Sequence, residues 1–81
     1  MTNDSMSIAR AIADELPRYG CTGRPFSTAG GAVLVYVRDA RGDDQGRIAV
    51  ARDGSITGRH LPPDRHWLLE PAQAVARRLC G

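Results

Sequence analysis

The chain has 81 residues, a formal net charge of +2 and an apolar fraction of 42%. A chain of this length buries only about 60% of the surface that its unfolded form exposes, so its core is thin. These values exclude a second domain, a deep substrate cleft and a doubly wound nucleotide-binding fold. No apolar run approaches the ~20 residues that a membrane-spanning helix needs.

The basic residues are all arginines, eleven in total, and acidic residues are interspersed among them. The alternation in sign between Asp39 and Arg47 is typical of a solvated surface. We interpret the absence of lysine, beside abundant alanine and glycine, as the coding bias of a GC-rich genome. A net charge of +2 is too small to predict strong steering toward polyanions.

The N-terminal region is predicted to hold a disordered tail over residues 1–6 and then a helix. Ser7 is the predicted N-cap, and apolar residues recur every four positions from Ile8 to Leu16, which predicts an amphipathic helix over 8–18. Gly20 is the predicted end of that segment. One α+β domain is expected over residues 7–81.

The start of the chain carries no apolar leader, so a cytoplasmic protein is expected. Cys21 and Cys80 are then expected to be free thiols, because disulfides are rare in that compartment.

Residues 20–31 are predicted to form a glycine-rich loop, with a short extended piece at 26–28. Such a loop can hold phosphate when it precedes a helix, but here a strand follows it and no Gly-Lys-Ser/Thr is present. Residues 32–37 form the clearest predicted strand, and both of its faces are apolar, as in a strand covered on two sides.

A second and a third strand are predicted over residues 47–51 and 55–59, joined by a hairpin at Asp53-Gly54. A three-residue loop pairs Val50 with Ile56 and places Ile48 on the same apolar face. A two-residue loop would put Ile56 on the other face, so the pattern favours the longer loop with Gly54 left-handed.

The C-terminal region ends in a predicted helix that has Pro71 in its first turn. Residues 64–69 fit either a helical turn capped by Asp64 or a short fourth strand, and Trp67 is the expected anchor of the C-terminal helix. The predicted fold is therefore α+β, a three-stranded antiparallel meander between an N-terminal and a C-terminal helix. The predicted core consists of Ile8, Ile12, Leu16, Val33, Val35, Val37, Ile48, Val50, Ile56, Leu61, Trp67, Val75 and Leu79.

This order of elements is shared with double-stranded-RNA-binding domains and with some small bacterial toxins. Such RNA-binding domains carry a lysine pair at the start of the last helix, where this chain has Glu70-Pro71. No family is assigned on element order alone.

The predicted functional surface is the strand at 32–37, which in a simple meander would be an exposed edge with two apolar faces. Exposed apolar edges are normally covered, so we expect a non-enzymatic interaction or regulatory module, most simply a homodimer, acting through Leu34, Tyr36 and Arg38. A protein partner is expected, and neither a cofactor nor a membrane is.

The alternative is a nucleic-acid-binding protein or a small toxin-like ribonuclease. Arg47, Arg52 and Arg59 would contact phosphate, and His60 and His66 would serve as base and acid. A third hypothesis places a metal ion at His60, Asp64 and His66. Two prolines lie between these residues, so the sequence does not determine whether the three side chains point toward one another, and no metal is predicted.

Overall fold

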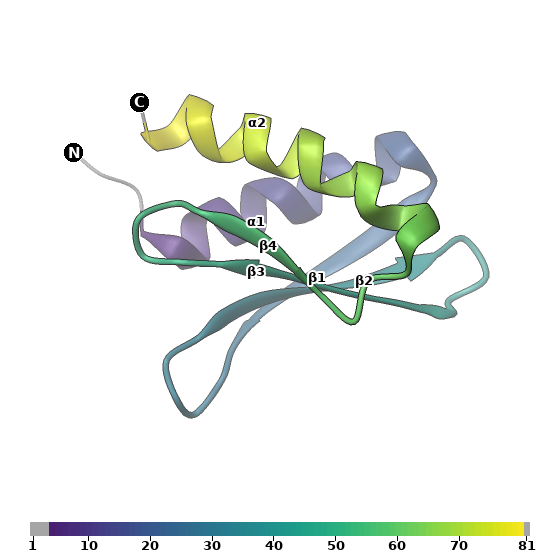
Figure 1. The fold of residues 1–81 in the computed structure, drawn as a ribbon, viewed down its shortest axis with the longest axis horizontal. Coiled ribbons are helices and arrows are strands. Elements are labelled where there is room, and N and C mark those ends of the chain that lie inside the picture. Colours follow the sequence, from purple (N-terminus) through teal and green to yellow (C-terminus); the bar gives the residue numbers. More distant parts are fainter. Residues whose placement is uncertain (1–3, 81) are drawn as a thin grey trace.

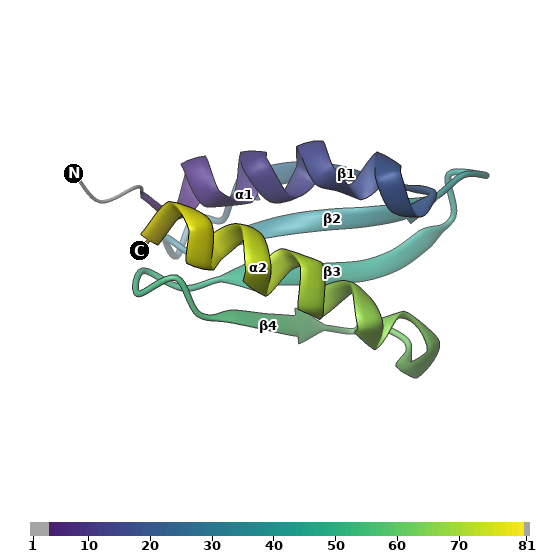
Figure 2. The same ribbon diagram turned by 90° about the horizontal axis from the view of Figure 1, so that it is seen from above.

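An antiparallel sheet and a layer of helices form the protein, as shown by a computed structural model that describes residues 4–80. In that range the elements follow in the order α1 (Ser5–Glu15), η1 (Leu16–Tyr19), β1 (Cys21–Ser27), β2 (Val33–Asp39), β3 (Asp44–Val50), β4 (Ile56–Arg59), η2 (Pro63–Leu68) and α2 (Leu69–Cys80), where η marks a 3-10 helix. The strands pair in the order β1-β2-β3-β4, each antiparallel to its neighbour. Figures 1 and 2 show α1 and α2 together over one face of the sheet.

The α+β class is confirmed, but the sheet formed by residues 4–80 has four strands instead of three. The additional strand, β1, occupies the segment that was predicted to be a glycine-rich loop. The reversal is confined to residues 28–32, where the Thr28 N–H donates to the Ala32 carbonyl at 2.8 Å and Gly31 has a φ of 85°. As a result β2 is an internal strand, paired on both sides, and the prediction that it forms an edge is wrong.

Pro25 and Gly23 lower the strand propensity of β1, yet each is tolerated for a structural reason. Pro25 lies opposite Val35, three residues before the hydrogen-bonded pair Thr28–Ala32, and this odd separation puts it at a position that is not hydrogen-bonded to β2. Its nitrogen therefore points away from β2. Proline is tolerated at such a position of an edge strand, because no hydrogen bond to the neighbouring strand is lost. A Cβ at Gly23 would lie 2.5 Å from Leu16 Cδ1 and 2.9 Å from Ala13 Cα, so the glycine lets α1 approach β1.

Helix α1 begins three residues earlier than the N-cap prediction implied. The cap is Asp4, whose carboxylate accepts a hydrogen bond from the Ser7 N–H at 2.7 Å. Residues 1–3 of the predicted tail lie outside the described residues. At the other end, Pro17 falls within the 3-10 helix η1, and Gly20 ends this segment with a φ of 76°, as predicted.

The hairpin between β3 and β4 confirms the predicted register. Val50 lies opposite Ile56, the Ala51 N–H donates to the Ser55 carbonyl at 2.9 Å, and Gly54 has a φ of 87°. Ile48 is buried on the same face. The three-residue loop is thus selected by the apolar pattern of the strands that it joins.

The segment before α2 is helical, which resolves the ambiguity at residues 64–69 in favour of a turn. It is the 3-10 helix η2, begun by Pro62 without a side-chain cap, so the predicted cap by Asp64 is wrong. The predicted anchor is also wrong: Trp67 is 43% exposed, whereas Leu68 is fully buried. Adjacent residues of a helix face different directions, and a tryptophan followed by two leucines did not reveal which of the three points inward.

The core lies between the sheet and the α1–α2 layer. Its largest fully buried side chains are Ile8, Ile12, Leu16, Val35, Val37, Ile48 and Leu68. Val33 and Leu79, which were predicted as core, are partly buried against it. Cys21 is a buried free thiol, and its Sγ lies 3.8 Å from the Tyr19 carbonyl oxygen. The side chain of Cys80 lies outside the described part of the structure.

Among residues 4–80, no helix is both long enough and apolar enough to cross a membrane.

Candidate functional site

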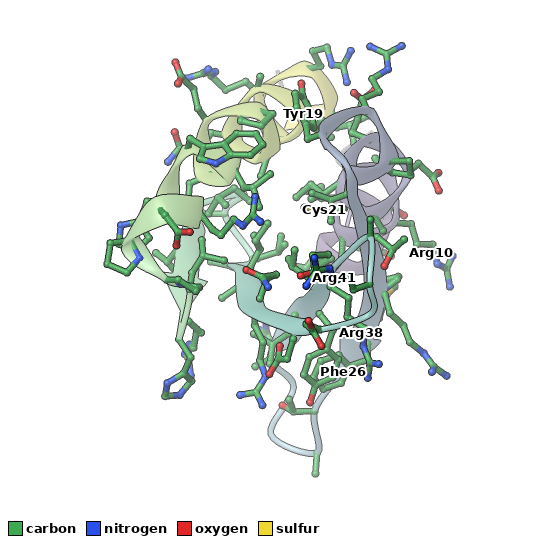
Figure 3. The ribbon with its side chains drawn as sticks, turned by 90° about the vertical axis from the view of Figure 1, so that its right-hand side faces the viewer. Arg10, Tyr19, Cys21, Phe26, Arg38 and Arg41 are labelled. Carbon is green, nitrogen blue, oxygen red and sulfur yellow. The ribbon has the colours of Figure 1, made fainter. Side chains whose placement is uncertain are left out.

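The candidate site is the face of the sheet that points away from α1 and α2, which we call the open face. Because side chains alternate along a strand and paired residues share a face, the register defines its members. They are Thr22, Arg24 and Phe26 on β1, Leu34, Tyr36 and Arg38 on β2, Asp44, Arg47 and Ala49 on β3, and Thr57 and Arg59 on β4. Figure 3 shows Phe26 and Arg38 on this side of the sheet, with Tyr19 on the side of the helices.

An aromatic stack crosses the open face from one strand to the next. The rings of Phe26 and Tyr36 are 4.3 Å apart and nearly parallel, at an angle of 5°. The Arg47 guanidinium carbon lies 4.9 Å from the centre of the Tyr36 ring, a cation–π contact. Since β1 and β3 flank β2, Tyr36 is held between Phe26 and Arg47 and is only half-buried.

Leu34, predicted as an exposed partner-binding residue, is buried to 7% exposure on the open face. The register places Phe26 and Ala49 on either side of it, and Tyr36 is the next residue along β2 on this face. The structure therefore brings the predicted trio of Leu34, Tyr36 and Arg38 to one face, but only Arg38 is exposed.

The exposed part of the open face is basic. Arg24, Arg38 and Arg59 are exposed and Arg47 is half-buried. Within residues 4–80 the ion pairs join Glu15 to Arg18 and Arg78, at 3.7 and 3.6 Å, so the arginines of the open face have no carboxylate partner in that range. Like charges on neighbouring strands repel each other, and an anionic ligand would relieve that repulsion.

Two acidic residues near Arg38 are engaged elsewhere. The Asp39 carboxylate accepts the N–H groups of Asp43 and Arg41, each at 2.9 Å, and the bond from Asp43 lowers the pKa of Asp39. Asp44, which lies opposite Arg38, accepts the Gly46 N–H at 2.9 Å. Arg38 itself makes one long hydrogen bond, from Nη1 to the Gly42 carbonyl at 3.5 Å.

A groove of about 630 Å³ opens over β1 and β2 on this face. Its lining residues are Thr22, Gly23, Arg24, Phe26, Tyr36 and Arg38. A second, smaller groove of about 360 Å³ lies at the end of the sheet near Ser5, Arg52 and Arg59. The first groove combines the two aromatic rings of Phe26 and Tyr36 with two exposed guanidinium groups.

The residues of the alternative prediction are divided by the fold. Arg47 and Arg59 are opposite each other on the open face, and Arg52 lies in the β3–β4 loop beside the second groove. His60 has a φ of 54°, a left-handed conformation at the end of β4. His66 bonds through Nε2 to the Leu61 carbonyl at 2.9 Å, so this nitrogen donates its proton to the backbone.

Neither of the grooves described above has His60 or His66 in its lining. In residues 4–80 no group of three or more His, Cys, Asp or Glu side chains is placed to hold a metal ion, so His60, Asp64 and His66 do not form one.

Thr22, Arg24 and Phe26 were missed by sequence reasoning because their segment was predicted to be a loop. The signal that would have found them is the Gly30-Gly31 pair. A turn there lets residues 21–27 fold back and pair with residues 33–39, a segment of equal length. Such a turn can join two strands in a hairpin.

No protein-family model matches the chain, and it has no match among curated proteins or among solved structures. The function is therefore inferred from the residues of the open face.

Proposed function

We propose that the chain is a small non-enzymatic protein that binds single-stranded nucleic acid across the open face of its sheet. The observation that carries the proposal is the set of arginines on that face without a carboxylate partner, arranged around the Phe26–Tyr36 stack. Sites for single strands combine positive charge along the backbone with aromatic rings for the bases.

A single strand suits this face better than a duplex does. Proteins that bind double-stranded RNA recognise its shape and contact phosphates across grooves, and they make little use of aromatic rings. The bases of a single strand are free to stack on rings, and the open face offers Phe26 beside Arg24 and Arg38.

Self-association through the sheet, our first prediction, has less support. Leu34 is buried by its own chain, and β2 is not an edge. The edge strands are poor templates for a second sheet, because β1 contains Pro25 and β4 has four residues. Cleavage of RNA also has little support, because the described grooves on and beside the sheet contain no histidine.

The test is fluorescence anisotropy with labelled single-stranded RNA and DNA of about 12 nucleotides, compared with a duplex of equal length. We expect single strands to bind more tightly than the duplex and to lose affinity as salt rises. If each of the four arginines neutralises one phosphate, the slope of log K against log salt should be about −3.

A matched pair of variants distinguishes the face from the overall charge. Arg24→Gln with Arg59→Gln removes two charges from the open face, whereas Arg10→Gln with Arg77→Gln removes two from α1 and α2. Only the first pair should weaken binding strongly. Equal losses, or no binding by the wild-type chain at low salt, would refute the proposal.

A further inference from the structure

The groove over β1 and β2 has the size and chemistry of a site for one nucleotide. Its volume of about 630 Å³ falls within the range of small-molecule sites, roughly 300–1,000 Å³. It is lined by the rings of Phe26 and Tyr36, by two exposed arginines and by Thr22. We infer that this groove binds one nucleotide of the single-stranded nucleic acid, with its base stacked on Phe26 and its phosphate between Arg24 and Arg38.

The base position follows from the end of the stack. Arg47, Tyr36 and Phe26 succeed one another from β3 to β1, so Tyr36 has a neighbour on each side. Phe26 is stacked on Tyr36 through one face, and in residues 4–80 no second ring or guanidinium packs on it. Because β1 is an edge strand, a base added to Phe26 extends the stack outward from the sheet.

The phosphate position follows from the register. Arg24 lies opposite Tyr36, and Arg38 lies opposite Thr22, so the two arginines are diagonal neighbours. Diagonal neighbours in an antiparallel pair are about 7–8 Å apart, a span over which two long guanidinium side chains can converge on one phosphate. Thr22 lies opposite Arg38 on the same face, and its hydroxyl can donate a third hydrogen bond to the phosphate.

The lining residues also indicate that the groove does not distinguish one base from another. It contains no Asn, Gln, Asp or Glu side chain among the described residues. Those side chains are usual readers of base edges. The two arginines of the groove, which could also read a base, are here assigned to the phosphate, and stacking on a ring accepts every base. We therefore expect the subsite to bind purine nucleotides more tightly only through their larger stacking area, without reading a sequence.

This inference rests on the proposed function, and the experiment separates the two. Backbone amide spectra of the wild-type chain are recorded by NMR during titration with adenosine monophosphate, with adenosine and with inorganic phosphate. Adenosine monophosphate should shift the amides of residues 22–24, 26 and 36–38 and should bind more tightly than either fragment. Phosphate alone binding as tightly as the nucleotide would refute the base position.

The variants Phe26→Leu and Arg24→Gln test the two halves of the subsite. Leucine keeps an apolar side chain over Leu34 while removing the ring, and its loss of affinity for the oligonucleotide should be about tenfold. Trp67→Leu removes an exposed ring outside the groove, and Arg10→Gln removes a charge from α1, so both are matched controls. Thermal unfolding of each variant confirms that it is folded.

The outcomes are distinct. Loss of nucleotide binding in Phe26→Leu and Arg24→Gln, with both controls unchanged, would support the subsite. If the oligonucleotide still binds with a steep salt dependence but Phe26→Leu is unaffected, the subsite is wrong and the proposed function stands. If the wild-type chain binds no single strand, both are wrong.

Discussion

Asp4 shows how one residue sets the start of an element. Its carboxylate accepts the Ser7 N–H at 2.7 Å, and this backbone hydrogen bond lowers the pKa of Asp4 below its ordinary value of 3.8. Both Asp and Ser are good N-caps, and the sequence has Asp4, Ser5 and Ser7 within four positions. The choice among them depends on the backbone: Asp4 is extended, with a φ of −78° and a ψ of 169°.

The pH dependence of stability is the prediction at this scale. A carboxylate whose pKa is lower in the folded state stabilises the fold above its unfolded pKa, and this contribution disappears as pH falls through the folded pKa. Asp4→Asn keeps an oxygen acceptor but does not titrate. We expect the wild-type chain to be the more stable at pH 7, with the difference shrinking below pH 3.8, as measured by urea unfolding. A difference that is constant with pH would contradict the assignment of Asp4 as an ionised cap.

At the scale of elements, the contact between α1 and β1 depends on the lack of a side chain at Gly23. A Cβ there would lie 2.9 Å from the backbone Cα of Ala13, closer than real Cβ atoms approach. The same close contact buries Leu16 and holds β1 in the sheet. Sequence reasoning took Gly23 as evidence for a loop, because glycine lowers strand propensity and its role in helix packing is visible only after the layers are assembled.

Gly23→Ala should therefore destabilise the protein by about 1–3 kcal/mol, as overpacking of a close contact does. Gly30→Ala is the control, since a Cβ there would meet only Thr28 Oγ1 at 3.9 Å. Its effect should remain within about 0.5 kcal/mol. Chemical denaturation of both variants measures the difference, and equal stabilities would show that α1 does not press on β1 as described.

At the scale of the whole molecule, the net charge of +2 conceals a separation of charge. The helix layer carries acidic and basic residues together, including the ion pairs of Glu15 with Arg18 and Arg78. The open face carries arginines on every strand, with Asp44 at one end. A field that attracts anions is therefore concentrated on one side of a nearly neutral protein.

Trp67 reports on which side a ligand binds. It is the only tryptophan, is 43% exposed, and packs edge-on against Tyr19 with ring centres 5.6 Å apart. Tyr19 lies on the helix side of the sheet (Figure 3). Saturation with a single-stranded oligonucleotide should leave the acrylamide quenching of tryptophan fluorescence unchanged. Strong protection of Trp67 would place the ligand at the helix layer instead.

The sequence by itself determined the elements whose signal is local. The continuous apolar run of β2 and the apolar alternation of β3 predicted strands between two helical segments, and so the α+β class. The pairing of Val50 with Ile56 followed from the loop length that keeps apolar residues on one face. The helical period from Ile8 to Leu16 located α1, although the predicted bounds of 8–18 lie beyond the observed start at Ser5 and the observed end at Glu15.

Only the tertiary structure decided what lies at the edge of the sheet and what faces solvent. Strand β1 has weak propensity of its own and exists because β2 pairs with it and α1 packs on it. Once β1 is in place, Leu34 is buried, Tyr36 stacks on Phe26, and Arg24 and Phe26 join Arg38 around one groove. These contacts join residues distant in sequence, so the local pattern could not reveal them, and the proposed site depends on them.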